Sequence, residues 1–194
     1  MLARLLGYEY NGDEYEFTDD ELSTVTIVRD RLYNHKVVRI NYTTYDVRRE
    51  QDSLNPRTHS DIVLYSHEDD VNTPTGHPYW YARIISIFHA EVVHTGSKSR
   101  SREPQRMEFL RVRWFGRDSS HQGGWTAKRL HRIGFLRASE DVGAFGFVDP
   151  QEVVRAIHLI PAFHFGQTKE LLSKSIARQE VEKDMDWCWY YVNM

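Results

Sequence analysis

The arginines Arg111, Arg113 and Arg117 have two aromatic residues interleaved among them, a pattern that suits contact with phosphates and stacking on bases. These aromatic residues, Trp114 and Phe115, directly follow Arg113. The same pattern also fits an ordinary strand with a charged outer row and an aromatic core row, and this alternative stays open. We predict a nucleic-acid-binding surface formed by eight basic residues: Arg102, Arg106, Arg111, Arg113, Arg117, Lys128, Arg129 and Arg132.

A second set of residues supplies aromatic rings for a ligand site. Two or three converging rings can hold a methylated ammonium group by cation–π attraction. The sequence provides the rings but does not show whether they converge in space. The candidate aromatic ligand-binding residues are Tyr79, Trp80, Tyr81, Trp114 and Trp125.

Histidine and cysteine form no recognisable catalytic or metal motif. The candidate histidine doublet is His158 with His164, six residues apart across a proline. Cys188 stands between Trp187 and Trp189, a setting typical of a buried thiol rather than a reactive thiolate. The glycine-rich nucleotide motifs and the serine-hydrolase and kinase signatures are absent. We therefore predict no metal, no cofactor and no catalytic residue, so that the chain is not an enzyme.

The small net charge of −3 conceals two oppositely charged regions. Residues 9–30 carry eight acids against one base, a local net of −7. Residues 97–137 carry eleven bases against three acids, a local net of +8. A basic face that meets phosphates, with an acidic arm that screens it, is one interpretation. Two solvated surfaces of opposite charge in one domain are the alternative.

The elements that must position these residues belong to one domain, or to one domain with an appended arm, because the chain has 194 residues. The N-terminus lacks the features of a signal peptide, and no window approaches 18 consecutive apolar residues, so we expect no membrane partner. With one cysteine, a disulfide framework is excluded. We expect an intracellular protein, with the nucleus favoured over the cytoplasm.

The N-terminal part predicts a helix near residues 19–33. Thr18 and Glu21 have the spacing of a capping box, and apolar residues follow at helical intervals. The β-branched run 23–28 keeps a strand open as the alternative.

The strongest strand signal is a hairpin formed by residues 79–89 and 106–116, joined by a polar, basic loop. The alternation assigns Arg83 and Ile87 to one side of the first strand and Ile84 to the other. In the second strand Met107, Phe109, Arg111, Arg113 and Phe115 share one side.

The remaining segments complete a mainly β prediction with flanking helices. Asp149 and Pro150 predict one helical turn, and a second helix is expected near residues 168–182. We predict an α+β fold built on an SH3-like, partly open β-barrel over residues 36–163. The predicted divisions are an acidic arm and helix at 1–35, the barrel at 36–163, and a C-terminal helix and aromatic tail at 164–194.

Two long motifs and one short motif resemble a known family. The sequence RINYTTYDVRREQDSLNPRTHSDIVL, the sequence GFVDPQEVVRAIHLIPAF at 146–163 and the sequence WYYVN at 189–193 are similar to the C-terminal region of Plavaka/CACTA-type or Kyakuja-Dileera-Zisupton-type transposases of mushroom-forming fungi. The resemblance covers most of residues 33–194. In such proteins the last motif continues further, so we expect this chain to be a fragment of a longer product.

A shorter likeness concerns the fold. YWYARIISIF at 79–88 and FLRVRWF at 109–115 are similar to the core hairpin of bromo-adjacent homology (BAH) domains, which bind chromatin proteins. The transposase resemblance implies a non-catalytic accessory domain that assists DNA or chromatin engagement. The alternatives are a module that binds a peptide or histone tail through its aromatic strands, and a structural domain that docks on the rest of a larger parent protein.

Overall fold

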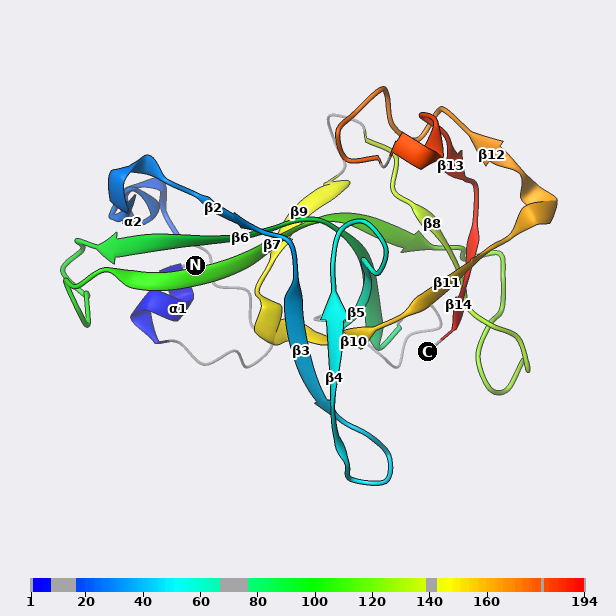
Figure 1. The fold of residues 1–194 in the computed structure, drawn as a ribbon, viewed down its shortest axis with the longest axis horizontal. Helices are drawn as coiled ribbons and strands as arrows, with labels where there is room; N and C mark the ends of the chain where they lie inside the picture. Colours follow the sequence, from blue (N-terminus) through cyan, green and yellow to red (C-terminus); the bar gives the residue numbers. More distant parts are fainter. Residues whose placement is uncertain (1, 8–16, 67–76, 139–142, 179, 194) are drawn as a thin grey trace.

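The computed structural model describes residues 2–7, 17–66, 77–138, 143–178 and 180–193, and it is mainly β, as predicted (Figure 1). Its α-helices are short: α1 (Leu2–Leu6) and α2 (Asp19–Ser23). The strands are β1 (Val25–Ile27), β2 (Tyr33–His35), β3 (Val38–Thr43), β4 (Arg49–Leu54), β5 (Asp61–Tyr65), β6 (Tyr79–His94), β7 (Gln105–Arg117), β8 (Arg132–Phe135), β9 (Phe145–Val148), β10 (Val153–Ala156), β11 (His158–Pro161), β12 (Gln167–Thr168), β13 (Asp186–Trp187) and β14 (Tyr190–Asn193).

The predicted hairpin is confirmed as the centre of the fold. Strands β6 and β7 pair antiparallel from Tyr81↔Phe115 to Val92↔Gln105. A register shift falls between Ile84 and Ser86, so that β6 carries one extra residue there. The bulge places Ile87 in the same buried cluster as Ile84, and the strict alternation that separated them was wrong.

The main sheet has the order β10-β5-β6-β7-β8-β14-β11, with β1 and β2 also pairing β6 and β9 pairing β7. Strands β10 and β11 follow each other in the chain, with Ile157 between them, yet they lie at opposite ends of this path. The sheet is not closed into a barrel, so the observed architecture agrees with the prediction of a mainly β fold but not with the predicted SH3-like, partly open barrel.

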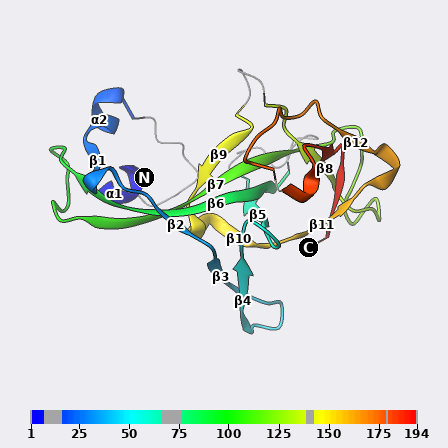
Figure 2. The same ribbon diagram turned by 45° about the horizontal axis from the view of Figure 1, so that its top comes forward.

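Both faces of the central hairpin carry core clusters, because its side chains alternate between the two faces. Ala82, Leu110 and Val112 belong to a cluster that also holds Ile40 and Leu54 of the β3–β4 hairpin. That hairpin projects from the sheet in both ribbon views (Figure 1, Figure 2). The opposite face is divided in two: one cluster lies under α1, and another lies under the C-terminal segment.

The β3–β4 hairpin is fastened to the edge of β10 by polar contacts. The Asp52 carboxylate accepts a hydrogen bond from the backbone N–H of Ala156, at 2.8 Å. The guanidinium of Arg155 lies 4.9 Å from the centre of the Tyr42 ring. An otherwise open strand edge is thereby blocked by side chains.

The N-terminal helix is much shorter than predicted. The capping box of Thr18 and Glu21 is present, but α2 ends at Ser23. The β-branched residues that follow form β1, which pairs with the end of β6. Arg29 and Asp30 then take positive φ values of 59° and 51°, which a continuing helix does not allow. Tertiary pairing therefore overrides the helical spacing, and the strand alternative describes residues 25–27.

The helix predicted near 168–182 is absent from the described residues of that segment. Residues 167–168 pair instead with 186–187 of β13, and only a 3₁₀ turn, η4 (Glu180–Glu182), follows. Leu172 is buried, but Ile176 is exposed. A short helix without a packed apolar face is marginal in water, so the modest periodicity does not suffice. The predicted turn after Asp149 is confirmed as η2 (Pro150–Glu152), with Asp149 as its N-cap.

Candidate binding pocket

The row of side chains on one side of β7 is covered at its two ends and open in the middle. Met107 packs in the cluster of Leu5 from α1, and Phe115 packs in the cluster that includes Tyr190 near the C-terminus. Between these covers lies a pocket of about 760 Å³. Its lining comes from α1, the β1–β2 region, β6, β7, β9 and the residue after β9: Arg4, Ile27, Leu32, Phe88, Met107, Glu108, Phe109, Arg111, Phe145, Gly146, Phe147, Val148 and Asp149.

Four phenylalanine rings dominate this pocket. The Phe88 and Phe109 ring centres are 5.6 Å apart, and those of Phe109 and Phe147 are 5.7 Å apart in an edge-to-face arrangement. Phe147 is 69% exposed. The fourth ring, that of Phe145, lies 5.9 Å from the Arg111 guanidinium. The pocket therefore presents a connected aromatic surface to solvent.

Gly146 explains how β9 brings its phenylalanines to this surface. A Cβ atom at this position would lie 2.5 Å from Nε1 of Trp114, so only glycine lets the strand approach the indole. Phe145 and Phe147, on either side of Gly146, consequently point to the other face. Phe147 is the direct cross-strand partner of Arg111.

The charged groups of the pocket are mostly paired. Arg4 donates to Asp149 at 2.8 Å, and Glu108 accepts from Arg106 at 2.9 Å. Arg111 is half-buried and has no carboxylate partner within the described ranges. No hydroxyl, thiol, imidazole or amine belongs to the described lining, and its two carboxylates, Glu108 and Asp149, are each held in an ion pair. The arrangement suits binding of an apolar group.

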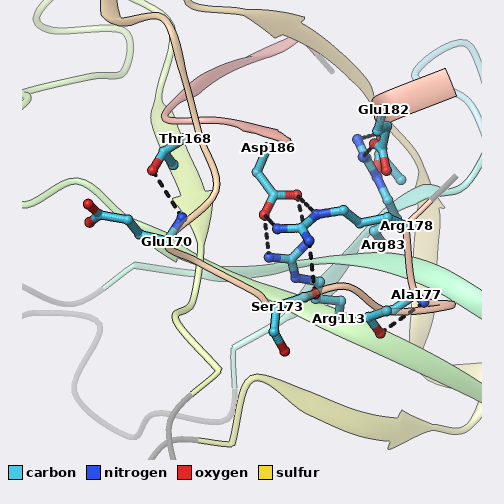
Figure 3. A network of polar contacts seen from close by, with 11 residues as sticks. Arg83, Arg113, Thr168, Glu170, Ser173, Ala177, Arg178, Glu182 and Asp186 are labelled. Atoms are coloured by element: carbon cyan, nitrogen blue, oxygen red, sulfur yellow. Dashed lines mark hydrogen bonds and ion pairs between the residues drawn. The ribbon is translucent and has the colours of Figure 1, made fainter. Parts of the chain in front are cut away.

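The predicted nucleic-acid residues do not share one face, and Arg113 is removed from the surface. Arg113 is 2% exposed, and its guanidinium donates to both oxygens of Asp186, at 2.8 and 2.9 Å. Arg178 donates to the same carboxylate at 2.7 and 3.2 Å (Figure 3). Arg113 also lies 3.8 Å from the centre of the Phe135 ring. As a correction, this arginine anchors the C-terminal segment and is not available to a phosphate.

Arg132 is likewise engaged inside the protein. Its guanidinium contacts Asp118 and lies 4.5 Å from the centre of the Phe165 ring. Its side chain is only 13% exposed. Ion pairing and ring stacking therefore account for Arg132 without an external ligand.

The remaining predicted basic residues lie in two distant groups. Arg102 and Arg106 belong to the tip of the β6–β7 hairpin, whereas Arg117, Lys128 and Arg129 belong to the end of β7 and the loop beyond it. Arg106 and Arg117 are eleven residues apart on one strand, or up to about 36 Å at 3.3 Å per residue. The hairpin tip and the loop lie at opposite ends of the molecule (Figure 1). Arg111 lies between them, in the pocket.

The predicted aromatic set does not converge either. Trp80 and Trp114 form an edge-to-face pair, with ring centres 5.9 Å apart, on one face of the sheet. Tyr79 and Tyr81 belong to the cluster on the other face. Trp125 is 99% exposed in the loop before β8. These five residues therefore do not form a single cage.

A histidine–tyrosine group at the start of β6 has perturbed acidity. Nε2 of His77 lies 2.9 Å from the Tyr81 hydroxyl, and the His77 and His131 ring centres are 4.6 Å apart. Burial, together with the charges of His131 and Arg117, lowers the pKa of His77 to about 4. Burial raises the pKa of Tyr81 to about 12. Both groups are therefore neutral at pH 7.

Within the described ranges, no group of three or more histidine, cysteine, aspartate or glutamate residues is placed to hold a metal ion. Among the helices of the same residues, none has the length and apolar character required to cross a membrane. The chain matches no family model, no curated protein and no solved structure. Its function must therefore be argued from the pocket and the surface.

The pocket residues Phe88, Phe145 and Phe147 were not among those selected from the sequence. Residues 145–148 show a phenylalanine on each side of Gly146, which is the local signal for a strand with a ring-bearing face. Nothing in the local sequence places that strand beside Phe109. The pairing of β9 with β7 supplies this information.

Proposed function

We propose that this chain is a non-catalytic protein-interaction domain, and that the pocket between α1, β7 and β9 holds an apolar side chain of a partner peptide. The observation that carries the proposal is the open aromatic surface of Phe88, Phe109 and Phe147, since a large ring exposed beside two others is typical of a binding site. The transposase resemblance suggests a chromatin-associated parent protein as the setting.

The exposed Phe147 allows a direct test. Phe147→Ala removes one wall of the pocket but little buried surface, so the fold should be retained. We expect it to weaken capture of peptides from a random-sequence display library at least fivefold. Tyr45→Ala is the matched control, because Tyr45 is a fully exposed aromatic residue outside the described pocket lining. Equal capture by the two variants would refute the assignment of the pocket.

DNA engagement is the second candidate function, and the tip of the β6–β7 hairpin favours it. Lys98, Arg100 and Arg102 are all exposed in this turn. Such a tip can contact phosphates in a salt-sensitive manner. In a gel-shift assay at low ionic strength, the variant with all three changed to Gln should lose retention, while Lys128→Gln/Arg129→Gln should keep it. No retention by the unaltered protein would exclude this function.

A further inference from the structure

Arg111 is the charged group of the pocket that has no opposite charge beside it in the described part of the chain. The other two cations near the pocket are each paired, Arg4 with Asp149 and Arg106 with Glu108. The Arg111 guanidinium lies 5.9 Å from the centre of the Phe145 ring. This ring contact offers cation–π attraction but accepts none of the five N–H donors of the guanidinium in a strong hydrogen bond.

Arg111 is also aligned with the aromatic surface. It shares one side of β7 with Phe109, two residues away. Phe147 stands directly opposite it on β9, which puts the Cβ atoms of this pair within about 5.5 Å. An apolar group that rests on Phe109 and Phe147 therefore has the guanidinium at its edge.

An anion next to an apolar group fits this geometry. A half-buried guanidinium forms charge-assisted, bidentate hydrogen bonds with a carboxylate, and the apolar walls strengthen them by excluding water. A cationic group at the same place would be repelled by the positive charge of Arg111. Charge complementarity with Arg111 thus favours an acidic ligand over a basic one.

The edge of β7 indicates that this ligand is an extended peptide. On the side away from β6, strand β9 pairs with residues 110–113 and β8 with residues 115–117. Residues 105–109 have no strand partner on that side among the described residues. Unpaired backbone groups at a sheet edge can receive a peptide strand, whose alternate side chains then enter an adjoining pocket.

We infer that the pocket selects extended peptides in which a phenylalanine or similar ring lies two residues from a glutamate or aspartate, so that both side chains share one face of the peptide, with the ring on Phe109 and Phe147 and the carboxylate on Arg111. This inference rests on the proposed function of the pocket as a peptide site. It adds the chemistry of the ligand and names Arg111 as the residue that determines specificity.

The test is a titration of the full chain with four synthetic peptides, followed by ¹⁵N–¹H NMR shifts. The probes are Gly-Glu-Ser-Phe-Ser-Glu-Gly, its Gln and Lys counterparts in place of Glu, and the version with Ala in place of Phe. We expect the Glu peptide to bind about fivefold more tightly than the Gln peptide, as for a partly exposed ion pair. Shifts should centre on residues 107–111 and 145–148.

Variants at Arg111 separate specificity from folding. Arg111→Met should abolish the preference for the Glu peptide over the Gln peptide, while Arg111→Lys should retain part of this preference. Arg39→Met, at an exposed arginine on β3, should leave the preference unchanged. The ¹⁵N–¹H spectrum of each variant also reports whether it remains folded.

The outcomes distinguish the two proposals. Equal binding of the Glu and Gln peptides at the pocket, unaffected by Arg111→Met, would overturn the inference about acidic ligands and leave the peptide site standing. Tighter binding of the Lys peptide would likewise overturn it. No shift at residues 107–111 or 145–148 with any peptide would overturn both proposals.

Discussion

Replacing Asp186 by alanine is predicted to be among the most destabilising single substitutions in this chain. The Asp186 carboxylate accepts four hydrogen bonds of 2.7–3.2 Å, two from Arg113 and two from Arg178. The Arg113 and Arg178 side chains are each 2% exposed. Asp186→Ala would leave two buried guanidinium groups without a counter-charge. Removing one partner of a buried ion pair costs about 3–5 kcal/mol. Because two buried cations lose their partner here, we expect a loss of stability near the upper end of this range.

The assay is urea unfolding followed by far-UV circular dichroism. The free energies of unfolding are compared between variants whose dependence on urea concentration has the same slope. Glu170→Ala is the surface control, since Glu170 and Arg137 are both well exposed, and it should cost less than about 1 kcal/mol. The triple variant Arg113→Met/Arg178→Met/Asp186→Leu should recover most of the lost stability, because three apolar side chains leave no unpaired charge in the interior. A loss for Asp186→Ala no larger than that of the control would refute the reasoning, as would a triple variant no more stable than the single one.

Two further predictions concern stability. Gly146→Ala should cost about 1–3 kcal/mol in urea unfolding, because the added Cβ would meet Trp114 at 2.5 Å; an unchanged midpoint would contradict the close approach of β9. Stability should fall as pH drops from about 6.5 to 4, because the unfolded state then binds a proton that folded His77, with its pKa near 4, does not. Allowing for solvent screening, the loss should be about 1–2 kcal/mol. The variant His77→Gln should flatten this part of the profile, and an identical profile for both proteins would contradict the assignment.

The parts of the fold that the sequence predicts are those determined by local periodicity. The alternation of residues 106–116 places Phe115 and Val112 on opposite faces, and the structure confirms it. The bulge after Ile84 has no local signature, because the extra residue is absorbed by pairing with β7. Likewise, the helical spacing after residue 24 is overridden by pairing with β6.

The candidate site was less predictable, since charge and ring content do not reveal burial. Arg113 and Arg111 occupy equivalent positions in the alternation, yet only Arg113 is covered by the C-terminal segment. The partner that buries it, Asp186, lies 73 residues further along the chain. The pocket could not be predicted from the local sequence for the same reason. Phe88, Phe109 and Phe147 come together only through the pairing of strands that are distant in the chain.

The most direct test of the central claim is an isotope-filtered nuclear Overhauser experiment on the full chain with Gly-Glu-Ser-Phe-Ser-Glu-Gly. If the pocket is a peptide site, the ring protons of the peptide phenylalanine should show cross-peaks to the ring protons of Phe109 and Phe147. Cross-peaks confined to exposed rings elsewhere, such as Tyr45 and Trp125, would contradict the account, and so would the absence of any cross-peak at saturating peptide.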